Sequence, residues 1–314
     1  MAQRTVKSRR RNRTEQRRPD IGLVLTGSLE QRWAVVLAML RATRRRCTEE
    51  SIHDLRVAMR RLAATIDILR MVVPDQQLDQ ARRALRKHLK SFNELRDVHV
   101  QILTVSGMVR KFPILRPYLA ELRRRERALV GHMRRRVGKI PVETIQRALA
   151  GATTRLLSLM TVPQARSVAE STVLGAMGSA FLRALDLRQQ LTPGDVRSVH
   201  RLRVAFKKCR YTVEVLRPLL AGVGRHQLKA MNAYQTFMGD VQDLAVLGAG
   251  LNTFVLRRRP ASPASYVGVQ QELARRQKNA IDLFIATADE LYGFWKSSLA
   301  DSHGPLHSAT RHRR

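Results

Sequence analysis

Aromatic residues, cysteines and acidic side chains are scarce in this chain of 314 residues. Aromatic residues make up 5% of it, 25 acidic residues stand against 58 basic ones, and Cys47 and Cys209 are the two cysteines. Two cysteines are too few for a disulfide scaffold and lack zinc-finger spacing, so we expect a reducing, intracellular location. The low aromatic content gives little support for a protein that stacks single-stranded bases.

Uninterrupted apolar segments are also short. A helix that crosses a bilayer needs about 20 mainly apolar residues, and the longest candidate, residues 23–40, is interrupted by Glu30, Gln31 and Arg32. The sequence therefore argues against a transmembrane helix. The arginine pair Arg9-Arg10 resembles an export signal, but no apolar segment of sufficient length follows it directly. Hydrophobic residues still make up 44% of the chain, which is enough for a packed core.

Arginine is what the sequence has in excess. The formal net charge is +33, and only ten of the 58 basic residues are lysine. A charge of this size opposes compaction, so we expect an anionic polymer as partner: nucleic acid, an anionic membrane surface or a phosphate polymer. Arginine favours phosphate because its planar group donates two parallel hydrogen bonds. Residues 1–18 hold only seven of the net charges, so the polyanion argument depends on the body of the chain.

The hydrophobic pattern is helical almost throughout. Apolar residues recur at intervals of three and four, and alternation with a period of two is scarce. Proline and glycine clusters divide this pattern near residues 74, 113–117, 138–141, 163, 193–194, 218–224 and 260–263. The sequence therefore predicts an all-α fold of roughly eight helices. A disordered basic tail (residues 1–19) and a polar C-terminal tail (residues 303–314) flank it.

An internal repeat organises the chain. Residues 51–62 return as residues 198–209, offset by 147 positions, with identical serine, histidine, leucine, arginine, valine and alanine. A weaker pair follows in the same order, residues 92–97 and 238–243. We therefore predict two related halves of about four helices each, residues 20–150 and 164–302.

Each copy of the repeat carries two stripes when it is placed on a helix that turns about 100° per residue. The apolar stripes predict the core positions Ile52, Leu55, Met59, Leu62, Ile66 and Leu69 in the first copy, and Val199, Leu202, Phe206, Cys209, Val213 and Leu216 in the second. Beside them lie the basic stripes His53, Arg56 and Arg60, and His200, Arg203, Lys207 and Arg210.

The basic stripes flank the apolar seams instead of opposing them, so they can line a crevice between the two halves. Two facing sets of cations repel each other unless an anionic chain lies between them. The alternative is an ordinary solvated helix surface whose cations are partnered by Asp54, Asp67 and Glu214.

The repeated histidines and acids each allow more than one role. His53 and His200 can contact phosphate or support helix starts at which Ser51 and Ser198 are the N-caps. A metal pair is less favoured, because no further ligand recurs in both copies and the arginines repel a dication. Asp97 and Asp243 are candidates for catalysis, for orienting basic side chains, or for capping a helix break near Asn93 and Gly239.

Motifs of known enzyme classes are mostly absent. The sequence has no phosphate-binding Gly-Lys-Ser/Thr loop, no dinucleotide Gly-x-Gly-x-x-Gly, no His-Glu-x-x-His and no Gly-x-Ser-x-Gly elbow. It also lacks a dense acidic cluster for Mg²⁺. We therefore expect binding without catalysis and no cofactor. Two other functions remain open: a nucleic-acid-binding protein that uses the arginine-rich tail, and a metal-dependent phosphohydrolase that uses the two histidines.

The repeated His-x-x-Arg-Val-Ala-x-Arg/Lys-Arg/Lys, each copy followed by Arg-Asp or Gln-Asp, resembles the CHAD domain, the conserved-histidine α-helical domain. The resemblance covers about residues 20–300. It implies two four-helix bundles related by pseudo-two-fold symmetry around a basic central pore. It also implies binding of inorganic polyphosphate, often at cytoplasmic polyphosphate granules, without known catalysis. Transferred by motif position, the polyphosphate-binding residues are His53, Arg56, Arg60, Arg61, His200, Arg203, Lys207, Lys208, Arg210 and Tyr211.

Two positions depart from that pattern. Ala63-Ala64 stands where the second copy has Arg210-Tyr211, so the first half is expected to bind more weakly. Asn93 replaces the glycine that commonly precedes Arg-Asp in this family. The alternating glutamates of the fused triphosphate-processing domain of some relatives are absent, so the chain resembles a stand-alone member.

Overall fold

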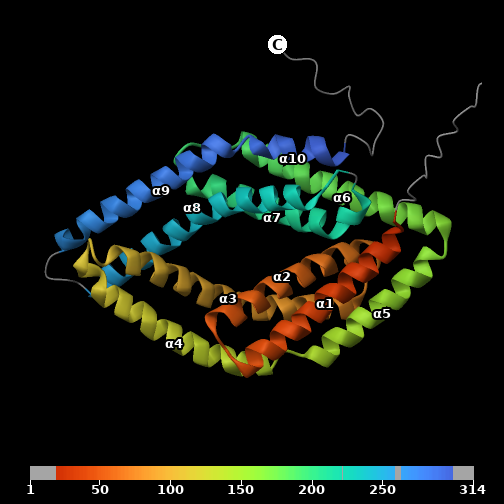
Figure 1. Ribbon diagram of the computed structural model, residues 1–314, viewed down its shortest axis with the longest axis horizontal. Coiled ribbons are helices and arrows are strands. Elements are labelled where there is room, and N and C mark those ends of the chain that lie inside the picture. The colour runs from red at the N-terminus through yellow and green to blue at the C-terminus, as the bar shows by residue number, and fades with distance from the viewer. Residues whose placement is uncertain (1–18, 221, 259–262, 300–314) are drawn as a thin grey trace, which may run out of the picture.

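A computed structural model describes residues 19–220, 222–258 and 263–299, and its regular structure in these ranges is entirely helical (Figure 1). The predicted all-α class is thus confirmed. Most of the two predicted tails, residues 1–18 and 303–314, lies outside the described residues. The helices are α1 (Ile21–Arg45), α2 (Glu49–Val72), α3 (Gln76–Met108), α4 (Arg116–Gly138), α5 (Val142–Met160), α6 (Pro163–Gln189), α7 (Val196–Leu216), α8 (Arg225–Arg258), α9 (Val267–Thr287) and α10 (Glu290–Leu299), with three short 3₁₀ turns.

The described ranges contain ten α-helices where about eight were expected, because two breaks carry no proline or glycine. At the break between α1 and α2, the Thr48 hydroxyl accepts from the Ser51 amide at 3.2 Å, and the Ser51 hydroxyl accepts from the Thr48 amide at 3.0 Å. This reciprocal pair is a capping box, so Thr48 is the N-cap. The other such break separates α9 from α10.

The N-cap prediction for the two serines was therefore wrong. Ser51 is the third residue of α2, and Ser198 is the third residue of α7. In α7 the Asp195 carboxylate is the cap, and it accepts from the amides of Arg197 at 2.8 Å and Ser198 at 3.1 Å. A short acidic side chain directly before the helix satisfies the free amides better than a residue already inside it.

The suggested helix break near Asn93 and Gly239 is also absent. Both α3 and α8 run continuously through these positions. Their buried positions coincide at an offset of 146 residues: Leu85, Phe92 and Leu95 match Met231, Met238 and Val241. An apolar stripe of helical period on both sides keeps each long helix intact, so the acids nearby cannot be helix caps.

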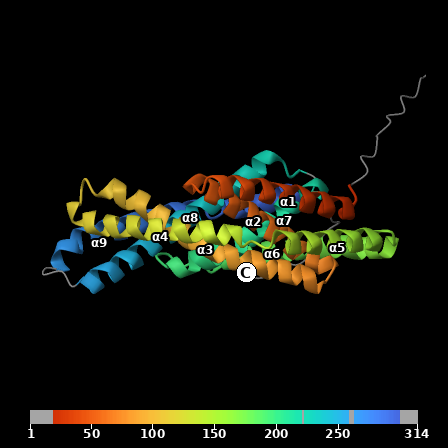
Figure 2. The same ribbon diagram turned by 90° about the horizontal axis from the view of Figure 1, so that it is seen from below.

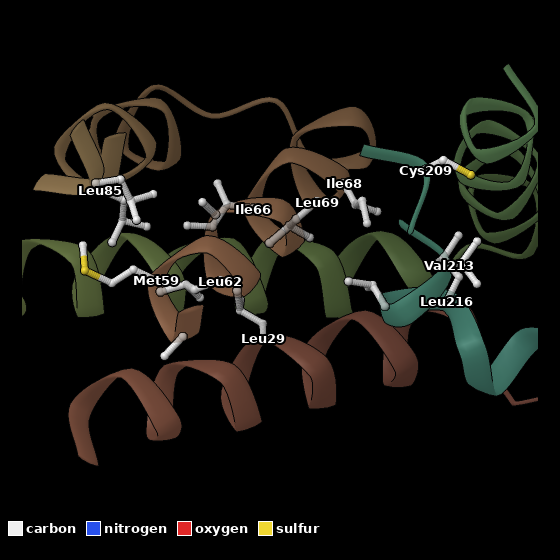
Figure 3. Packing of buried hydrophobic residues seen from close by; sticks show 14 of the residues in the cluster. Leu29, Met59, Leu62, Ile66, Ile68, Leu69, Leu85, Cys209, Val213 and Leu216 are labelled. Carbon is white, nitrogen blue, oxygen red and sulfur yellow. The ribbon is translucent and has the colours of Figure 1, made fainter. Parts of the chain in front are cut away.

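The apolar stripes of both repeat copies are buried, as predicted. Every position of the two stripes is at most 5% exposed, and Figure 3 shows Met59, Leu62, Ile66 and Leu69 packed between Leu29 of α1 and neighbouring helices. Removing this much apolar surface from water is the main driving force for the fold. A second, smaller core joins the far ends of α3 and α4 to those of α8 and α9, where Tyr118 packs on Phe254.

The two halves of the chain meet along their repeated segments. Helix α2 packs against α7, and α3 packs against α8. Figure 1 shows α1–α5 on one side of this contact and α6–α10 on the other, and in Figure 2 the far ends of α4 and α9 lie at the same end of the elongated molecule. The motif copies therefore face each other across one interface.

Helix α1 is the one helix among the described residues that is long and apolar enough to cross a membrane by length and composition. Its residues Leu25, Leu29, Val36 and Leu40 are at most 2% exposed in the main core. A core helix passes the same test of composition, and α1 packs closely on α2.

Candidate functional site

Basic side chains from α2, α3 and α7 gather where the repeated segments meet. We call Arg56, Arg60, Arg96, Arg203, Lys207 and Arg210 the basic cluster. Arg56 and Arg210 are each 7% exposed, and the other four are partly buried. Arg96 and Arg210 have carboxylate partners within the protein, Asp243 and Glu214. The other four form no ion pair among the described residues, and because arginine and lysine are rarely buried unless they are paired, these four call for an anionic partner.

The cluster is electrostatically crowded. Burial, and after it the positive charges of Arg60, Arg203, Arg56 and Arg210, lower the pKa of Lys207 to about 8. Burial, together with Arg60 and Arg96, lowers the pKa of Arg56 to about 10. The cations of α2 and those of α7 are therefore close enough to repel each other.

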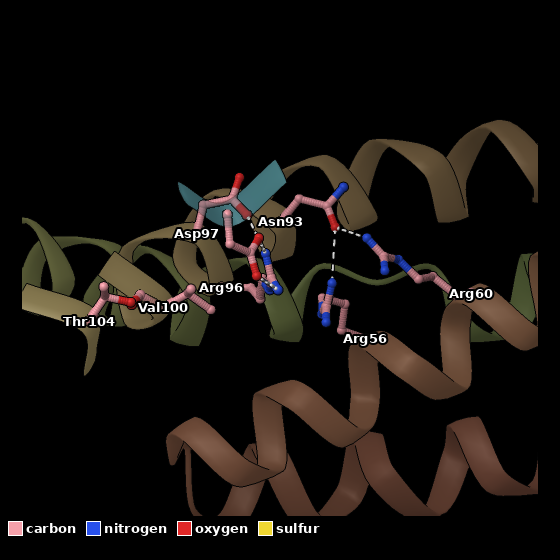
Figure 4. Close-up of polar contacts among 8 residues, drawn as sticks. Arg56, Arg60, Asn93, Arg96, Asp97, Val100 and Thr104 are labelled. Atoms are coloured by element: carbon pink, nitrogen blue, oxygen red, sulfur yellow. Dashed lines mark hydrogen bonds and ion pairs between the residues drawn. The ribbon is translucent and has the colours of Figure 1, made fainter. Parts of the chain in front are cut away.

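Asn93 of α3 orients the two arginines of α2. Its Oδ1 atom accepts from Arg60 Nη2 at 2.5 Å and from Arg56 Nη1 at 3.5 Å (Figure 4). The Nε atoms of Arg56 and Arg203 are buried and have no hydrogen-bond partner within the described structure. A buried N–H without a partner is costly, so an acceptor that reached these two donors would be favoured.

The repeated acids orient Arg96. Both terminal nitrogens of Arg96 donate to the Asp243 carboxylate of α8, and Arg96 Nη1 also lies 3.3 Å from Asp97 Oδ1. Although burial lowers the pKa of Arg96, the hydrogen bonds and charges of Asp243 and Asp97 raise it overall. Of the roles open to Asp97 and Asp243, the geometry matches the orienting one.

A groove of about 1110 Å³ lies beside the cluster, between α2, α3 and α7. Its basic lining residues are Arg60, Arg82, Arg86, Lys87, Lys90, Arg136, Lys207 and Lys208. The lining acids are already engaged, since Asp67 binds Arg82 at 2.6 Å and Glu94 binds Arg125 at 2.9 Å. The groove therefore offers a surplus of positive charge, and it is large enough for an extended anion.

Sequence reasoning missed the α3 side of this groove. Arg82, Arg86 and Lys90 recur every four residues and so share one face of α3, with Lys87 beside them. That spacing was available in the sequence. These residues carry no duplicated motif, and their importance depends on α3 facing α7 across the groove.

The predicted site residues divide into two groups. Arg56, Arg60, Arg203, Lys207 and Arg210 belong to the cluster, while Lys208 and Tyr211 line the groove. Arg210 also lies over the Tyr211 ring, 4.5 Å from its centroid, and its Nε donates to Gln235 at 3.0 Å.

The remaining predicted residues lie at the edge or outside. His53 and His200 are exposed. The pKa of His53 is lowered, first by the partial desolvation of its ring and then by the nearby charge of Arg56. Arg61 forms an ion pair with Glu214, in which its Nε atom lies 2.9 Å from Glu214 Oε1. Among the described residues, no three His, Cys, Asp or Glu side chains gather in a way that could hold a metal ion.

Comparison with known proteins identifies a matching sequence family and two solved structures of similar fold. The CHAD-domain sequence family matches residues 27–252. The crystal structure of the CHAD domain from the plant Ricinus communis superimposes with a TM-score of 0.66 at 19% identity, covering 86% of this chain and 91% of that one. PptA from Streptomyces chartreusis superimposes with a TM-score of 0.54 at 16% identity, covering 88% of this chain and 99% of that one.

No curated protein sequence matches the chain. The two structural similarities show the fold, and the family match extends over well more than half of the 314 residues. On that match the protein is a member of the CHAD-domain family.

Proposed function

We propose that this protein binds inorganic polyphosphate at the basic cluster and its adjoining groove. The observation that carries the proposal is the convergence of cations from both copies of the repeat, with the buried Nε donors of Arg56 and Arg203 left without partners. Polyphosphate supplies closely spaced anionic oxygens, which form strong charge-assisted hydrogen bonds with arginine. A neutral or cationic ligand offers no relief of the repulsion among these side chains.

The proposal includes the architecture that the family resemblance implies. Two related helical halves surround a basic channel, and the packing of α2 on α7 and of α3 on α8 supports this arrangement. Equivalent positions of the two halves share their burial at offsets of 147 and 146 residues, as expected for a duplicated unit. The bound chain lies between the halves and neutralises both sets of cations.

We further propose that the protein binds polyphosphate without cleaving or extending it, in the cytoplasm at polyphosphate granules. The lack of catalysis is supported by the absence of nucleotide-binding and hydrolase motifs in the sequence, and the location follows from the family resemblance. A phosphate-release assay on long-chain polyphosphate, with and without divalent metal, tests the first part. A fluorescent fusion imaged with a polyphosphate stain tests the second.

Binding is tested by titrating long-chain polyphosphate and duplex DNA at equal phosphate concentration. We expect tighter binding of polyphosphate and loss of that binding in the double variant Arg203→Glu, Lys207→Glu. The matched control reverses two exposed arginines of α4 away from the groove, Arg123→Glu and Arg127→Glu, so the net charge changes equally. Equal affinity for DNA, or equal losses in the two double variants, would refute a specific site.

A further inference from the structure

The groove is open on one side of the α2–α7 interface, and its counterpart on the other side differs. Positions of α2 and α7 correspond at an offset of 147 residues and those of α3 and α8 at 146, and the buried residues coincide in both pairs. A continuous channel needs a basic opening at each end. The residues of the second opening can therefore be identified by number and compared with those of the first.

The basic opening on α3 is not repeated on α8. The positions equivalent to Arg82, Arg86, Lys87 and Lys90 are occupied by Leu228, Asn232, Ala233 and Thr236. Four cations are thus replaced by uncharged side chains. An anionic chain that approaches the α8 side meets none of the charges that line the α3 side.

Glu214 occupies the second side instead. It is the counterpart of Asp67, but it reaches across to α2 and α1, where it lies 2.9 Å from Arg61 and 3.6 Å from Arg32. It also lies 3.6 Å from Arg210 of its own helix. The Glu214 side chain is only 17% exposed, so this carboxylate with three arginines ties α7 to its neighbours where the second opening would be.

The basic cluster therefore has a cation-lined groove on its α3 side and the Glu214 ion pairs on the other side. Arg60 and Lys207 belong to the cluster and also line the groove, together with Asn93. The partnerless Nε atoms of Arg56 and Arg203 are buried within the cluster. Positive charge thus increases from the groove toward the cluster. A linear anion whose terminal group carries more negative charge than its internal groups matches this distribution of positive charge best.

We propose that the site binds the end of a polyphosphate chain, which enters from the α3 side and places its terminal phosphate in the basic cluster. This inference rests on the proposed function and deepens it. A terminal phosphate has a second ionisation with a pKa of ~6 and so carries close to two charges at neutral pH, whereas each internal phosphate carries one. The terminal group therefore gains most from the surrounding cations of the cluster.

The stoichiometry of binding distinguishes ends from internal segments. Linear polyphosphates of several defined lengths are titrated in calorimetry, at a salt concentration where the variant Arg203→Glu, Lys207→Glu no longer binds. End binding predicts at most two protein molecules per chain at every length, and loss of binding when both ends are esterified. A stoichiometry that rises with chain length would overturn the inference and leave the proposed function intact. Absence of binding at every length would overturn the proposed function itself.

A matched pair of variants tests the direction of entry. Lys87→Ser with Lys90→Ser removes two cations from the α3 opening, and Arg225→Ser with Lys229→Ser removes two exposed cations of α8. We expect at least a tenfold loss of affinity for the first pair and less than a twofold loss for the second. All four positions are on helix surfaces, so unchanged melting curves would show that folding is unaffected. Equal losses in both pairs would indicate a chain that passes through, against the proposal.

Discussion

Arg96 of α3 and Asp243 of α8, 147 positions apart in the sequence, form a bidentate ion pair that joins the two halves of the chain. Arg96 also belongs to the basic cluster, so the same contact holds the halves together and fixes one cation of the site. Asp97, the repeat counterpart of Asp243, contributes a single longer contact of 3.3 Å. The two acids thus differ in importance although the repeat relates them.

Removing the Asp243 carboxylate is expected to destabilise the fold. Asp243→Asn leaves the partly buried Arg96 without its main partner, and we expect a loss of ~1–3 kcal/mol in the free energy of unfolding. Denaturant unfolding followed by circular dichroism measures it. The control Asp97→Asn removes a 43%-exposed carboxylate, and we expect a loss of less than ~1 kcal/mol. Equal losses would mean that the bidentate pair has no special role in joining the halves.

The free protein should become more stable as the pH rises through the pKa of Lys207. Its pKa is about 8 in the folded protein against 10.5 for an unperturbed lysine, so between these pH values the unfolded chain binds a proton that the folded chain has released. Stability therefore increases with pH in this window, by on the order of 1–3 kcal/mol from this side chain. Below pH 8 Lys207 is protonated in both the folded and the unfolded protein, so the full cost of burying its charge beside other cations remains.

Comparison with Lys207→Met isolates this contribution, because the other titrating groups are common to both proteins. The difference in unfolding free energy between wild type and variant should shrink as the pH is raised from 7 to about 10. If the unfolding free energies of the two proteins changed in parallel over this range, the pKa of Lys207 would not be lowered in the folded protein.

Binding of polyphosphate should show the opposite pH dependence. The anion favours protonated Lys207, so affinity should fall as the pH passes above 8. In the variant Lys207→Arg the charge persists at higher pH, and the fall in affinity should be smaller. Calorimetric titration at several pH values provides the measurement, and identical profiles for the two proteins would exclude Lys207 from the contact.

Gly250 is required where α8 crosses the far ends of α3 and α4. A Cβ atom at this position would lie 2.7 Å from the Tyr118 hydroxyl and 3.0 Å from Gln101 Oε1, which are hydrogen-bonded to each other at 2.8 Å. Gly250→Ala should therefore cost ~1–3 kcal/mol of unfolding free energy. Gly248→Ala is the control: its Cβ meets no atom within 4 Å, so higher helix propensity should stabilise it by up to ~1 kcal/mol. Stabilisation by both substitutions would contradict the close approach of Tyr118.

Local pattern was enough to predict much of the fold. The apolar stripes from Ile52 to Leu69 and from Val199 to Leu216 are buried as their helical period predicted. The break before Thr48 was missed, because a capping box of Thr and Ser is a weaker signal than proline or glycine. The serines were misplaced by three residues for the same reason: several polar residues near a helix start can serve as cap, and the sequence does not say which one does.

The sequence alone determined the helical class, the duplicated motif and the stripe on which Arg56, Arg60, Arg203 and Lys207 lie, since each follows from the rotation of a single helix. Only the tertiary structure decided that Arg96 pairs with Asp243, that Arg86 and Lys90 complete a groove, and that Glu214 lies on the other side of the α2–α7 interface. These contacts join helices far apart in the chain. The partner of a charged side chain depends on how those helices cross, which the period of one helix does not specify.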